Sequence, residues 1–457
     1  MVLGSATVVL AIAVPAARAG TGGEPAPAGI VSATPPASLP HLLASTSQIN
    51  QVRQLVQCGG TMYAVGSFNT IQQGSTTYTR NDIFSFSATA PYTITNWAPN
   101  VVGTYGVVFK SSSDVLNTIA FAGGTCADAY IGGNFSSVNG TAVRDIAEID
   151  TTTGNVVGTF ASNASSPVET IVAAGSHLLV GGRFTSINGD STDKYMVSLN
   201  PVTGQSDGFL SLNISGNYQF PGVTSNATHI LNQQLSHGGT LDLVEGDFTS
   251  VGGQARQQAF VLDLSGATAA VTGWNAPEFT TNCYATEPFY VRAGAWSPDD
   301  STLYFGTTGF HPNGLPTGSY PRSGPCDAAL AFPSSPTTVS ALWTNYTGCD
   351  SLYAAAADSN AAYFAGHERW SMNPLGCDFQ GTGGIPAPGT EGVDPANGAV
   401  YLNAAGTAGY YSRSRGLGAD DMLLTSAGLW IASDNYNSAQ YCGGVSTSGI
   451  CFLPYGH

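Results

Sequence analysis

Charged side chains are scarce in this sequence. Asp, Glu, Lys and Arg make up only 9% of its 457 residues, and 29 acidic residues against 13 basic ones give a formal net charge of -16 at pH 7. A protein that binds nucleic acid needs a basic surface to neutralise phosphate groups. The composition therefore argues against a nucleic-acid partner.

The sequence also lacks the signatures of common enzymes and metal sites. It has no HExxH motif, no Gly-x-Ser-x-Gly motif and no phosphate-binding loop. No two cysteines have the CxxC spacing of a zinc site, and the acidic residues have no EF-hand spacing. The carboxylate pair Asp299 and Asp300 lies in a turn-like stretch, which argues against a glycosidase role. We therefore assign no catalytic residue, no metal and no cofactor.

No long apolar run follows the first twenty residues, so we expect no membrane span. Residues 1–19 combine an apolar run with Ala17-Arg18-Ala19, the small-x-small pattern of a signal-peptide cleavage site, although no basic residue precedes the run. We predict that residues 1–19 are a signal peptide and that the protein is secreted and extracellular. Residues 20–40 are rich in Gly, Pro and Ala, which predicts a linker, and residues 41–457 are expected to form one monomeric domain.

Eight cysteines in an exported chain predict disulfide bonds. Cys442 and Cys451 bracket a turn-rich stretch and form the best-supported pair. The other pairs follow from sequence order alone: Cys58 with Cys126, Cys283 with Cys326, and Cys349 with Cys377. Counting cysteines leaves many other connectivities open.

A short pattern recurs along the chain. Residues 130–140 read YIGGNFSSVNG, and close copies begin at Tyr63, Leu179 and Val244. Each copy has an apolar, strand-like run, then a Gly two residues before a Phe, then a polar stretch that ends in Gly. Because these residues recur in several units, we interpret the Gly and the Phe as structural rather than functional.

The recurring glycine divides the chain into units of similar length. Degenerate copies extend the series to seven positions: Gly66, Gly133, Gly182, Gly246, Gly306, Gly366 and Ser433. Each interval can hold about four strands of the usual length with their turns, which is the size of a propeller blade. The pattern predicts an all-β, seven-bladed β-propeller with four-stranded antiparallel blades. We expect an N-terminal strand at residues 41–48 to close the last blade, which otherwise lacks its fourth strand.

The repeated segments GGNFSSVNG, GGRFTSING and EGDFTSVGG share a wider context. Each is followed by a basic residue, an alternating apolar strand such as IAEID or FVLDL, and a turn that starts with Asp or Asn and ends in Gly. Over roughly residues 50–270 the chain resembles the delta-60-type repeat β-propellers of secreted bacterial proteins, which are relatives of the kelch and galactose-oxidase-type propellers. The resemblance implies a propeller fold and an extracellular location, but no single activity.

The basic residue of each regular unit has two interpretations. These residues are Arg80, Arg144, Lys194 and Arg256. They could line one face and bind an anionic glycan, or each could donate hydrogen bonds to carbonyl groups of its own blade. We favour the second interpretation, since a shared ring of positive charge fits poorly with so acidic a protein.

The most distinctive local cluster is His367-Glu368-Arg369-Trp370, which replaces the regular Gly-x-Phe turn. His311 lies in the comparable loop of the preceding unit. One interpretation is a ligand-binding pocket in which Trp370 stacks on a sugar and its three neighbours form hydrogen bonds. The other is that Arg369 and Trp370 fill the gap between two blades as a divergent repeat.

Three functions are compatible with these observations. The first is a secreted, non-enzymatic binding module for a cell-surface glycan or protein. The second is a secreted propeller enzyme that acts on carbohydrate through the loops near His311 and His367, and the third is a purely structural surface protein. Convergence of these histidines with Glu368 and Arg369 in one pocket would favour a specific ligand, whereas side chains that point into the core would remove the named site.

Overall fold

The computed structural model describes most of the chain after residue 21. The described residues are 22–43, 49–103, 107–108, 112–113, 115–217, 227–283, 288–309, 324–436 and 440–456. The predicted signal peptide at residues 1–19 lies outside them, as does His311. The regular secondary structure of the described part consists of β-strands and one short 3-10 helix, η1 (Pro277–Thr280). No helix among these residues is long and apolar enough to cross a membrane.

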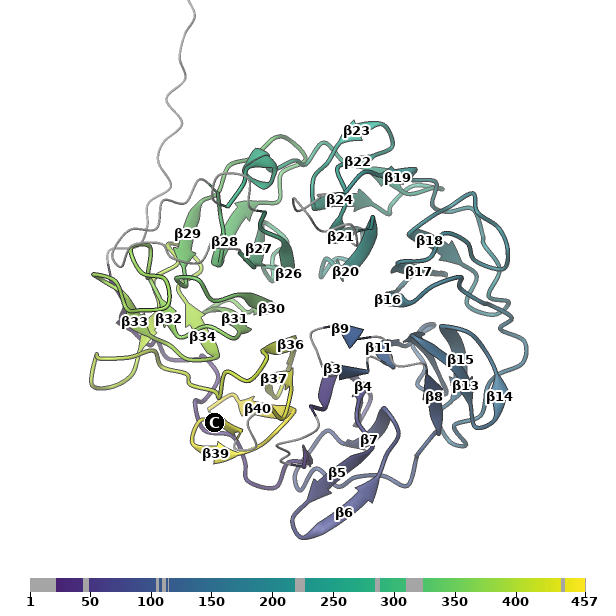
Figure 1. The fold of residues 1–457 in the computed structure, drawn as a ribbon, viewed down its shortest axis with the longest axis horizontal. Helices are drawn as coiled ribbons and strands as arrows, with labels where there is room; N and C mark the ends of the chain where they lie inside the picture. Colours follow the sequence, from purple (N-terminus) through teal and green to yellow (C-terminus); the bar gives the residue numbers. More distant parts are fainter. Residues whose placement is uncertain are drawn as a thin grey trace, which may run out of the picture.

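Seven antiparallel sheets stand in a ring, and the chain forms them one after another (Figure 1). We number them as blades 1 to 7 in chain order. Blade 1 consists of β3 (Gln51–Cys58), β4 (Thr61–Ser67) and β7 (Ile83–Ser87). Blade 2 consists of β11 (Leu116–Ala120), β12 (Asp128–Gly133) and β15 (Ile146–Asp150). Blade 3 consists of β16 (Val168–Ala174), β17 (His177–Gly182) and β18 (Met196–Leu199).

Blades 4 and 5 each have four strands. They consist of β20 (His229–Leu235), β21 (Leu241–Asp247), β24 (Ala259–Asp263) and β25 (Ala270–Val271), and of β26 (Val291–Trp296), β27 (Thr302–Thr307), β28 (Ala328–Pro333) and β29 (Trp343–Tyr346). Blades 6 and 7 consist of β30 (Leu352–Ala357), β31 (Ala362–Gly366) and β34 (Thr390–Val393), and of β36 (Ala419–Thr425), β37 (Gly428–Ser433) and β40 (Ile450–Pro454). In every blade the first strand lies nearest the centre of the ring (Figure 1).

Among the described residues, the predicted four strands per blade are therefore found only in blades 4 and 5. In blades 1, 2, 3 and 6 a single antiparallel bridge stands where a fourth strand would begin: Phe86 with Ile94, Ile149 with Val156, Leu199 with Ser206, and Val393 with Val400. The segments that follow, such as residues 155–166, are polar and rich in turn residues. They lack the alternating apolar residues that would extend the pairing.

The recurring glycine has a geometric cause, which blade 1 illustrates. β3 carries a β-bulge opposite Gly66, with Arg53 as the extra residue. A Cβ atom on Gly66 would lie 2.1 Å from the carbonyl oxygen of Gln51, so the close approach of the two strands requires glycine. The same contact with a backbone oxygen recurs at Gly133, Gly182, Gly246 and Gly366.

All seven first strands carry a bulge in the same place. In blade 7, Ser433 faces the bulge, as the alignment predicted. In blade 5, however, Thr307 faces it through its pairing with Val291, and Gly306 is one residue out of register. The alignment there followed the glycine because nothing in the sequence shows that Thr307 has taken its place.

The N-terminal segment closes the ring at blade 7. Val31 forms an antiparallel bridge with Tyr455, and the N–H of Ser32 donates to the carbonyl oxygen of Pro454 at 2.7 Å. Val31 thus stands beside β40, where a fourth strand would begin, and its side chain is fully buried. The described part of the predicted linker is therefore packed against the blades, because Val31 and Leu39 supply apolar side chains that its Gly and Pro content obscures.

The closing strand expected at residues 41–48 is not found there. β2 (His41–Leu42) pairs with β5 (Thr70–Gln73) of blade 1, while the N–H of Leu42 donates to the carbonyl oxygen of Ser448 in blade 7 at 2.8 Å. Residues 44–48 lie outside the described part of the chain. The segment from Val31 to Leu42 therefore crosses from blade 7 to blade 1.

Short outer sheets extend several blades. They are formed by β2, β5 and β6 (Thr76–Thr79); β8 (Val101–Gly103), β13 (Phe135–Val138) and β14 (Thr141–Ala142); β19 (Ile214–Ser215), β22 (Ser250–Val251) and β23 (Gln254–Ala255); β32 (Trp370–Ser371) and β33 (Ile385–Pro386); and β38 (Tyr441–Cys442) and β39 (Val445–Ser446). β1 (Glu24–Pro25) pairs in parallel with β35 (Tyr401–Leu402) beside blade 6, and β9 (Val107–Val108) with β10 (Ser112–Ser113) forms a small hairpin.

The hydrophobic core is divided among the gaps between blades. Each of its seven buried clusters combines side chains from two neighbouring sheets. Blades 7 and 1, at opposite ends of the chain, share one of them, in which the rings of Trp430 and Phe86 lie 5.6 Å apart. The repeated Phe68, Phe135, Phe184 and Phe248 are buried in these clusters, which agrees with their predicted structural role.

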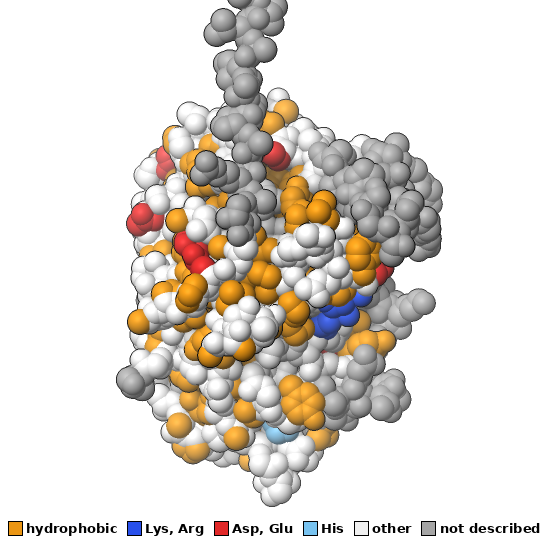
Figure 2. Space-filling view, turned by 90° about the vertical axis from the view of Figure 1, so that its left-hand side faces the viewer, with side chains coloured by type: hydrophobic (Ala, Val, Ile, Leu, Met, Phe, Trp, Pro, Cys, Tyr) orange, Lys and Arg blue, Asp and Glu red, His pale blue; other side chains and the backbone are white. Residues whose placement is uncertain are grey.

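Four disulfide bonds join the eight cysteines. They connect Cys58 with Cys126, Cys283 with Cys326, Cys349 with Cys377, and Cys442 with Cys451, which are the pairs expected from sequence order. The rim shown in Figure 2 carries few acidic or basic side chains among hydrophobic and uncharged polar groups, as the low charge content requires.

Candidate functional site

Asp350 is the centre of the cluster that the sequence singled out. Its carboxylate lies just before β30, and only 1% of the side chain is exposed. Arg369 donates to it from Nε at 2.7 Å and from Nη2 at 2.8 Å, and Arg415 donates from Nη2 at 3.0 Å. His367 Nε2 lies 3.7 Å from the same carboxylate. One buried acid thus holds two partly exposed arginine side chains, and the His367 imidazole lies beside them.

These side chains come from two blades. His367 and Arg369 follow β31 of blade 6, whereas Arg415 precedes β36 of blade 7. Arg415 Nε also donates to the carbonyl oxygen of His367 at 2.6 Å. The cluster therefore ties the loop after β31 to the connection between blades 6 and 7.

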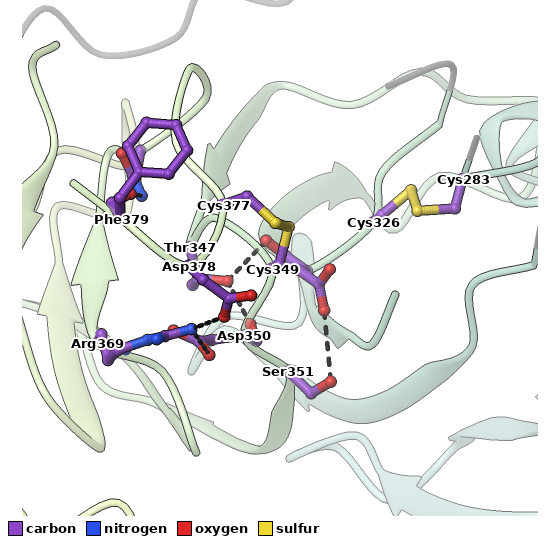
Figure 3. The surroundings of a disulfide bond; sticks show 12 residues. Cys283, Cys326, Thr347, Cys349, Asp350, Ser351, Arg369, Cys377, Asp378 and Phe379 are labelled. Atoms are coloured by element: carbon purple, nitrogen blue, oxygen red, sulfur yellow. Dashed lines mark hydrogen bonds and ion pairs between the residues drawn. A yellow bond between two sulfur atoms is a disulfide. The ribbon is translucent and has the colours of Figure 1, made fainter. Parts of the chain in front are cut away.

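A disulfide bond lies directly beside Asp350 (Figure 3). Cys349 precedes Asp350, and its partner Cys377 precedes Asp378. Asp378 forms an ion pair with Arg369, as the dashed lines in Figure 3 show. The disulfide bond thus links the segment that carries Asp350 to the segment that carries Asp378 and limits the conformational freedom of both.

Trp370 is covered on one side by its neighbour. The guanidinium carbon of Arg369 lies 4.6 Å from the centre of the Trp370 ring, which is a cation–π distance. Trp370 itself is half-buried in β32, where it pairs with Pro386 of β33. Its indole ring therefore lies partly exposed at the surface, in contact with the Arg369 guanidinium.

Glu368 does not belong to this surface group, contrary to the pocket interpretation. Its side chain is fully buried, as is that of Glu391, and neither of its carboxyl oxygens has a hydrogen-bond partner among the described residues. Burial, reinforced by the nearby charge of Glu391, raises the pKa of Glu368 well above its usual range. Successive residues of an extended segment point to opposite sides, so Glu368 turns inward while His367 and Arg369 turn outward.

His367 is neutral at neutral pH. Burial, together with the positive charge of Arg415, lowers its pKa to about 4. With 37% of its side chain exposed, the imidazole can offer one donor and one acceptor to a partner.

The structure thus brings together three of the five predicted ligand-binding residues: His367, Arg369 and Trp370. Glu368 lies in the core, and His311 lies outside the described residues. The sequence analysis missed Asp350, Asp378 and Arg415. A signal for two of them was present, because Asp directly follows Cys at residues 326–327, 349–350 and 377–378. Arg415 had no such signal, since its role depends on packing between blades 6 and 7.

The repeated basic residues do not form a shared site. Arg80 donates to the carbonyl oxygens of Thr79 and Thr95, and Arg256 donates to those of Ala255 and Thr272. Arg144 donates likewise to the carbonyl oxygen of Ser165, in the connection to the next blade. These contacts confirm the structural interpretation for the three arginines. No group of three or more potential metal ligands occurs among the described residues.

Comparisons with known proteins give only distant structural similarities. No protein-family model matches the sequence, and no curated protein matches it. The structure is similar to that of U3-55K, with a TM-score of 0.47 and 8% identity over 92% of this chain and 100% of the other. It is also similar to the RRP9 WD40 repeats, with a TM-score of 0.45 and 8% identity over 91% of this chain and 99% of the other. The computationally designed Ika8 protein gives a TM-score of 0.41 and 8% identity over 90% of this chain and 98% of the other. At this identity, nothing about function follows.

Proposed function

We propose that this protein is an exported, monomeric, non-enzymatic β-propeller that binds a glycan at the rim of blades 6 and 7. The observation that carries the proposal is the set of side chains held by Asp350. Arg369, Arg415 and His367 are 26%, 33% and 37% exposed; Asp350 accepts hydrogen bonds from both arginines, and Arg415 in turn donates to the backbone carbonyl oxygen of His367. A site with fixed donors loses little conformational entropy when it binds.

The chemistry of the cluster suits a hydroxyl-rich, uncharged partner. The charges of Arg369 and Arg415 are balanced by those of Asp350 and Asp378, so the group has no net charge to attract an ion. It offers guanidinium and imidazole hydrogen-bonding groups beside the half-buried indole of Trp370. Directional donors next to an aromatic ring are the features that orient a sugar in a binding site. A surface protein that presents similar groups is the alternative partner.

Binding is favoured over catalysis by the position of the carboxyl groups. A glycosidase of the usual kind needs two carboxyl groups that reach the same sugar. The buried pair, Glu368 and Glu391, is 0% and 1% exposed, so neither can reach a ligand. In the candidate site, the buried Asp350 and the exposed Asp378 are both paired with Arg369. A carbohydrate-acting enzyme therefore has weaker support at this rim.

Export and family membership are part of the proposal. Disulfide bonds persist in oxidising compartments, and the described chain has four. The signal-peptide pattern at residues 1–19 points the same way. The repeated GGNFSSVNG-like segments support a relationship to the delta-60-type propellers.

A glycan-array screen of the mature protein tests this function. We expect binding to a subset of glycans that is lost in Trp370→Ala and weakened in His367→Ala. Tyr78→Ala is the matched control, because Tyr78 is a half-buried aromatic residue in β6, beside blade 1, with the guanidinium carbon of Arg80 5.4 Å from its ring centre. Absence of binding to every glycan, or equal loss in all three variants, would refute the glycan site.

A further inference from the structure

A cavity of about 100 Å³ lies among the first strands of the blades. Its lining includes the bulge residue of every blade, so the bulges that require the recurring glycine also shape this cavity. These residues are Arg53, Asn117, Glu169, Leu231, Arg292, Tyr353 and Asp420. Unlike the repeated Gly and Phe, they differ from blade to blade. This variation within a fixed framework is what a specific site requires.

Most of the polar bulge residues are satisfied by their neighbours. Arg53 Nη1 donates to Asp420 Oδ1 at 2.9 Å. Glu169 accepts hydrogen bonds from Asn117 at 2.9 Å and from Arg183 at 2.7 Å. The two carboxylates of the ring are thus already neutralised by guanidinium groups.

Arg292 is the exception. Its guanidinium donates no hydrogen bond and forms no ion pair with any described residue; it lies over the ring of Tyr353, whose centre is 5.7 Å away, and the charges of Asp420, Arg53 and Arg183 act on it from beyond ion-pair distance. The residue is half-buried and lines the cavity, so its guanidinium is accessible to a ligand there. The side-chain amide of Gln234, which also lines the cavity, likewise makes no hydrogen bond within the described chain.

Other carboxyl groups nearby do not compensate Arg292. Asp421 accepts a hydrogen bond from the N–H of Leu55 at 3.0 Å, and burial raises its pKa to about 6. Glu245 accepts one from Asn232 at 3.0 Å, and burial raises its pKa to about 8, so it is largely uncharged at neutral pH. Neither carboxyl group forms an ion pair with Arg292.

We propose that this cavity binds a small hydroxylated carboxylic acid, whose carboxylate pairs with Arg292 and whose hydroxyl groups reach Gln234. The planar guanidinium matches a carboxylate through two parallel hydrogen bonds. A doubly charged phosphate suits the cavity less well, because Arg53 and Arg183 are already paired with Asp420 and Glu169, which leaves Arg292 to balance two negative charges alone. By the space that one water requires, the cavity has room for roughly seven waters, which is comparable to a small organic acid.

The site is separate from the glycan rim at Asp350, so the two proposals can fail independently. The two possible roles of Arg292, structural or ligand-binding, also predict opposite effects of its mutation on the melting temperature. If Arg292 awaits a ligand, replacing it with methionine removes an uncompensated charge and should leave the melting temperature of the ligand-free protein unchanged or raise it. If Arg292 is structural, the same change should lower the melting temperature.

The test measures thermal shifts and calorimetric binding with D-glucuronate and D-lactate, and with D-glucose and phosphate as controls at matched ionic strength. We expect a shift with at least one of the two acids, absent with glucose and smaller with phosphate. Arg292→Met should abolish this shift, and Arg292→Lys, which keeps the charge but not the planar fork, should weaken binding roughly tenfold. Arg144→Gln is the control, because Arg144 is 62% exposed and remote from the cavity.

Several outcomes would overturn the proposal. One is that neither acid shifts the wild-type protein, and another is that phosphate shifts it as strongly as the acids do. A shift that persists in Arg292→Met would place the acid elsewhere, and a lower melting temperature of ligand-free Arg292→Met would make the arginine structural. Should Arg292→Met fail to fold, an unweakened response of Arg292→Lys would also count against the assignment.

Discussion

The second strand of blade 1 brings Gly66 so close to the carbonyl oxygen of Gln51 that an added Cβ atom would lie 2.1 Å from it. We expect Gly66→Ala to lower the free energy of unfolding by about 2–4 kcal/mol, because the strands must move apart to admit the methyl group. Urea unfolding monitored by tryptophan fluorescence measures this loss. Gly60→Ala, in the same hairpin, has nothing within 4 Å of its new Cβ and should change stability by less than about 0.5 kcal/mol. Equal losses in the two variants would contradict the explanation.

Val31 should contribute to stability as a core residue despite its place in a Gly- and Pro-rich segment. Its side chain is fully buried beside blade 7. We expect Val31→Ala to cost about 1–3 kcal/mol in urea unfolding, since it removes two buried methyl groups and leaves a cavity. The same change at Val202, which is 64% exposed, is the control and should be nearly neutral. A neutral Val31→Ala would mean that the segment behaves as the linker its composition suggests.

Removal of the charge on Asp350 should destabilise the protein more than removal of the charge on Asp378. Asp350→Asn would leave Arg369 and Arg415 without their buried counterion, and we expect a loss of about 3 kcal/mol in the free energy of unfolding. Asp378 is 63% exposed, so Asp378→Asn should cost less than about 1 kcal/mol. Chemical denaturation of the two variants provides the comparison. The reverse order would show that Asp350 does not organise the cluster.

The contact between β1 and blade 6 should weaken as pH rises. Burial, with a hydrogen bond and repulsion from Asp394, raises the pKa of Glu24 to about 7. A carboxyl group whose pKa rises on folding contributes fully at low pH, and this contribution is lost as pH increases from about 4.5 to about 7. We therefore expect the melting temperature of the wild type to fall more between about pH 5 and about pH 8 than that of Glu24→Gln. Identical pH profiles would exclude a contribution from this pair.

The repeat was readable from sequence because its cause is local and steric. Wherever a bulge forces two backbones together, glycine is required, and Gly66 and Gly133 therefore mark the ends of second strands. In blade 5 the glycine pattern placed the bulge position at Gly306, one residue away from Thr307, which faces the bulge. The repeat length also led to the prediction of a fourth strand in every blade, because length alone does not distinguish a strand from a single bridge such as that between Ile149 and Val156.

The candidate site was only partly predictable. His367, Arg369 and Trp370 were visible because they interrupt the repeat. The inward turn of Glu368 follows from strand alternation, but only once the segment is known to be extended. Asp350 and Arg415 meet through packing between blades 6 and 7, and Arg292 became notable only when its surroundings showed no acceptor. Such contacts join residues that are far apart in the sequence and meet only in the closed ring, so no local sequence pattern predicts them.

The shared cores also determine where the chain can be interrupted. Since every core lies between two blades, an isolated blade would retain half of each of two cores and should not fold alone. In the complete ring, by contrast, the chain could begin at any blade without loss of a core. Val31 and Tyr455 already lie side by side, so a peptide that joins the two ends would span a short distance. A circular permutant opened in the connection between blades 2 and 3 would keep all seven cores intact, and the order in which the blades are synthesised would then become an experimental variable.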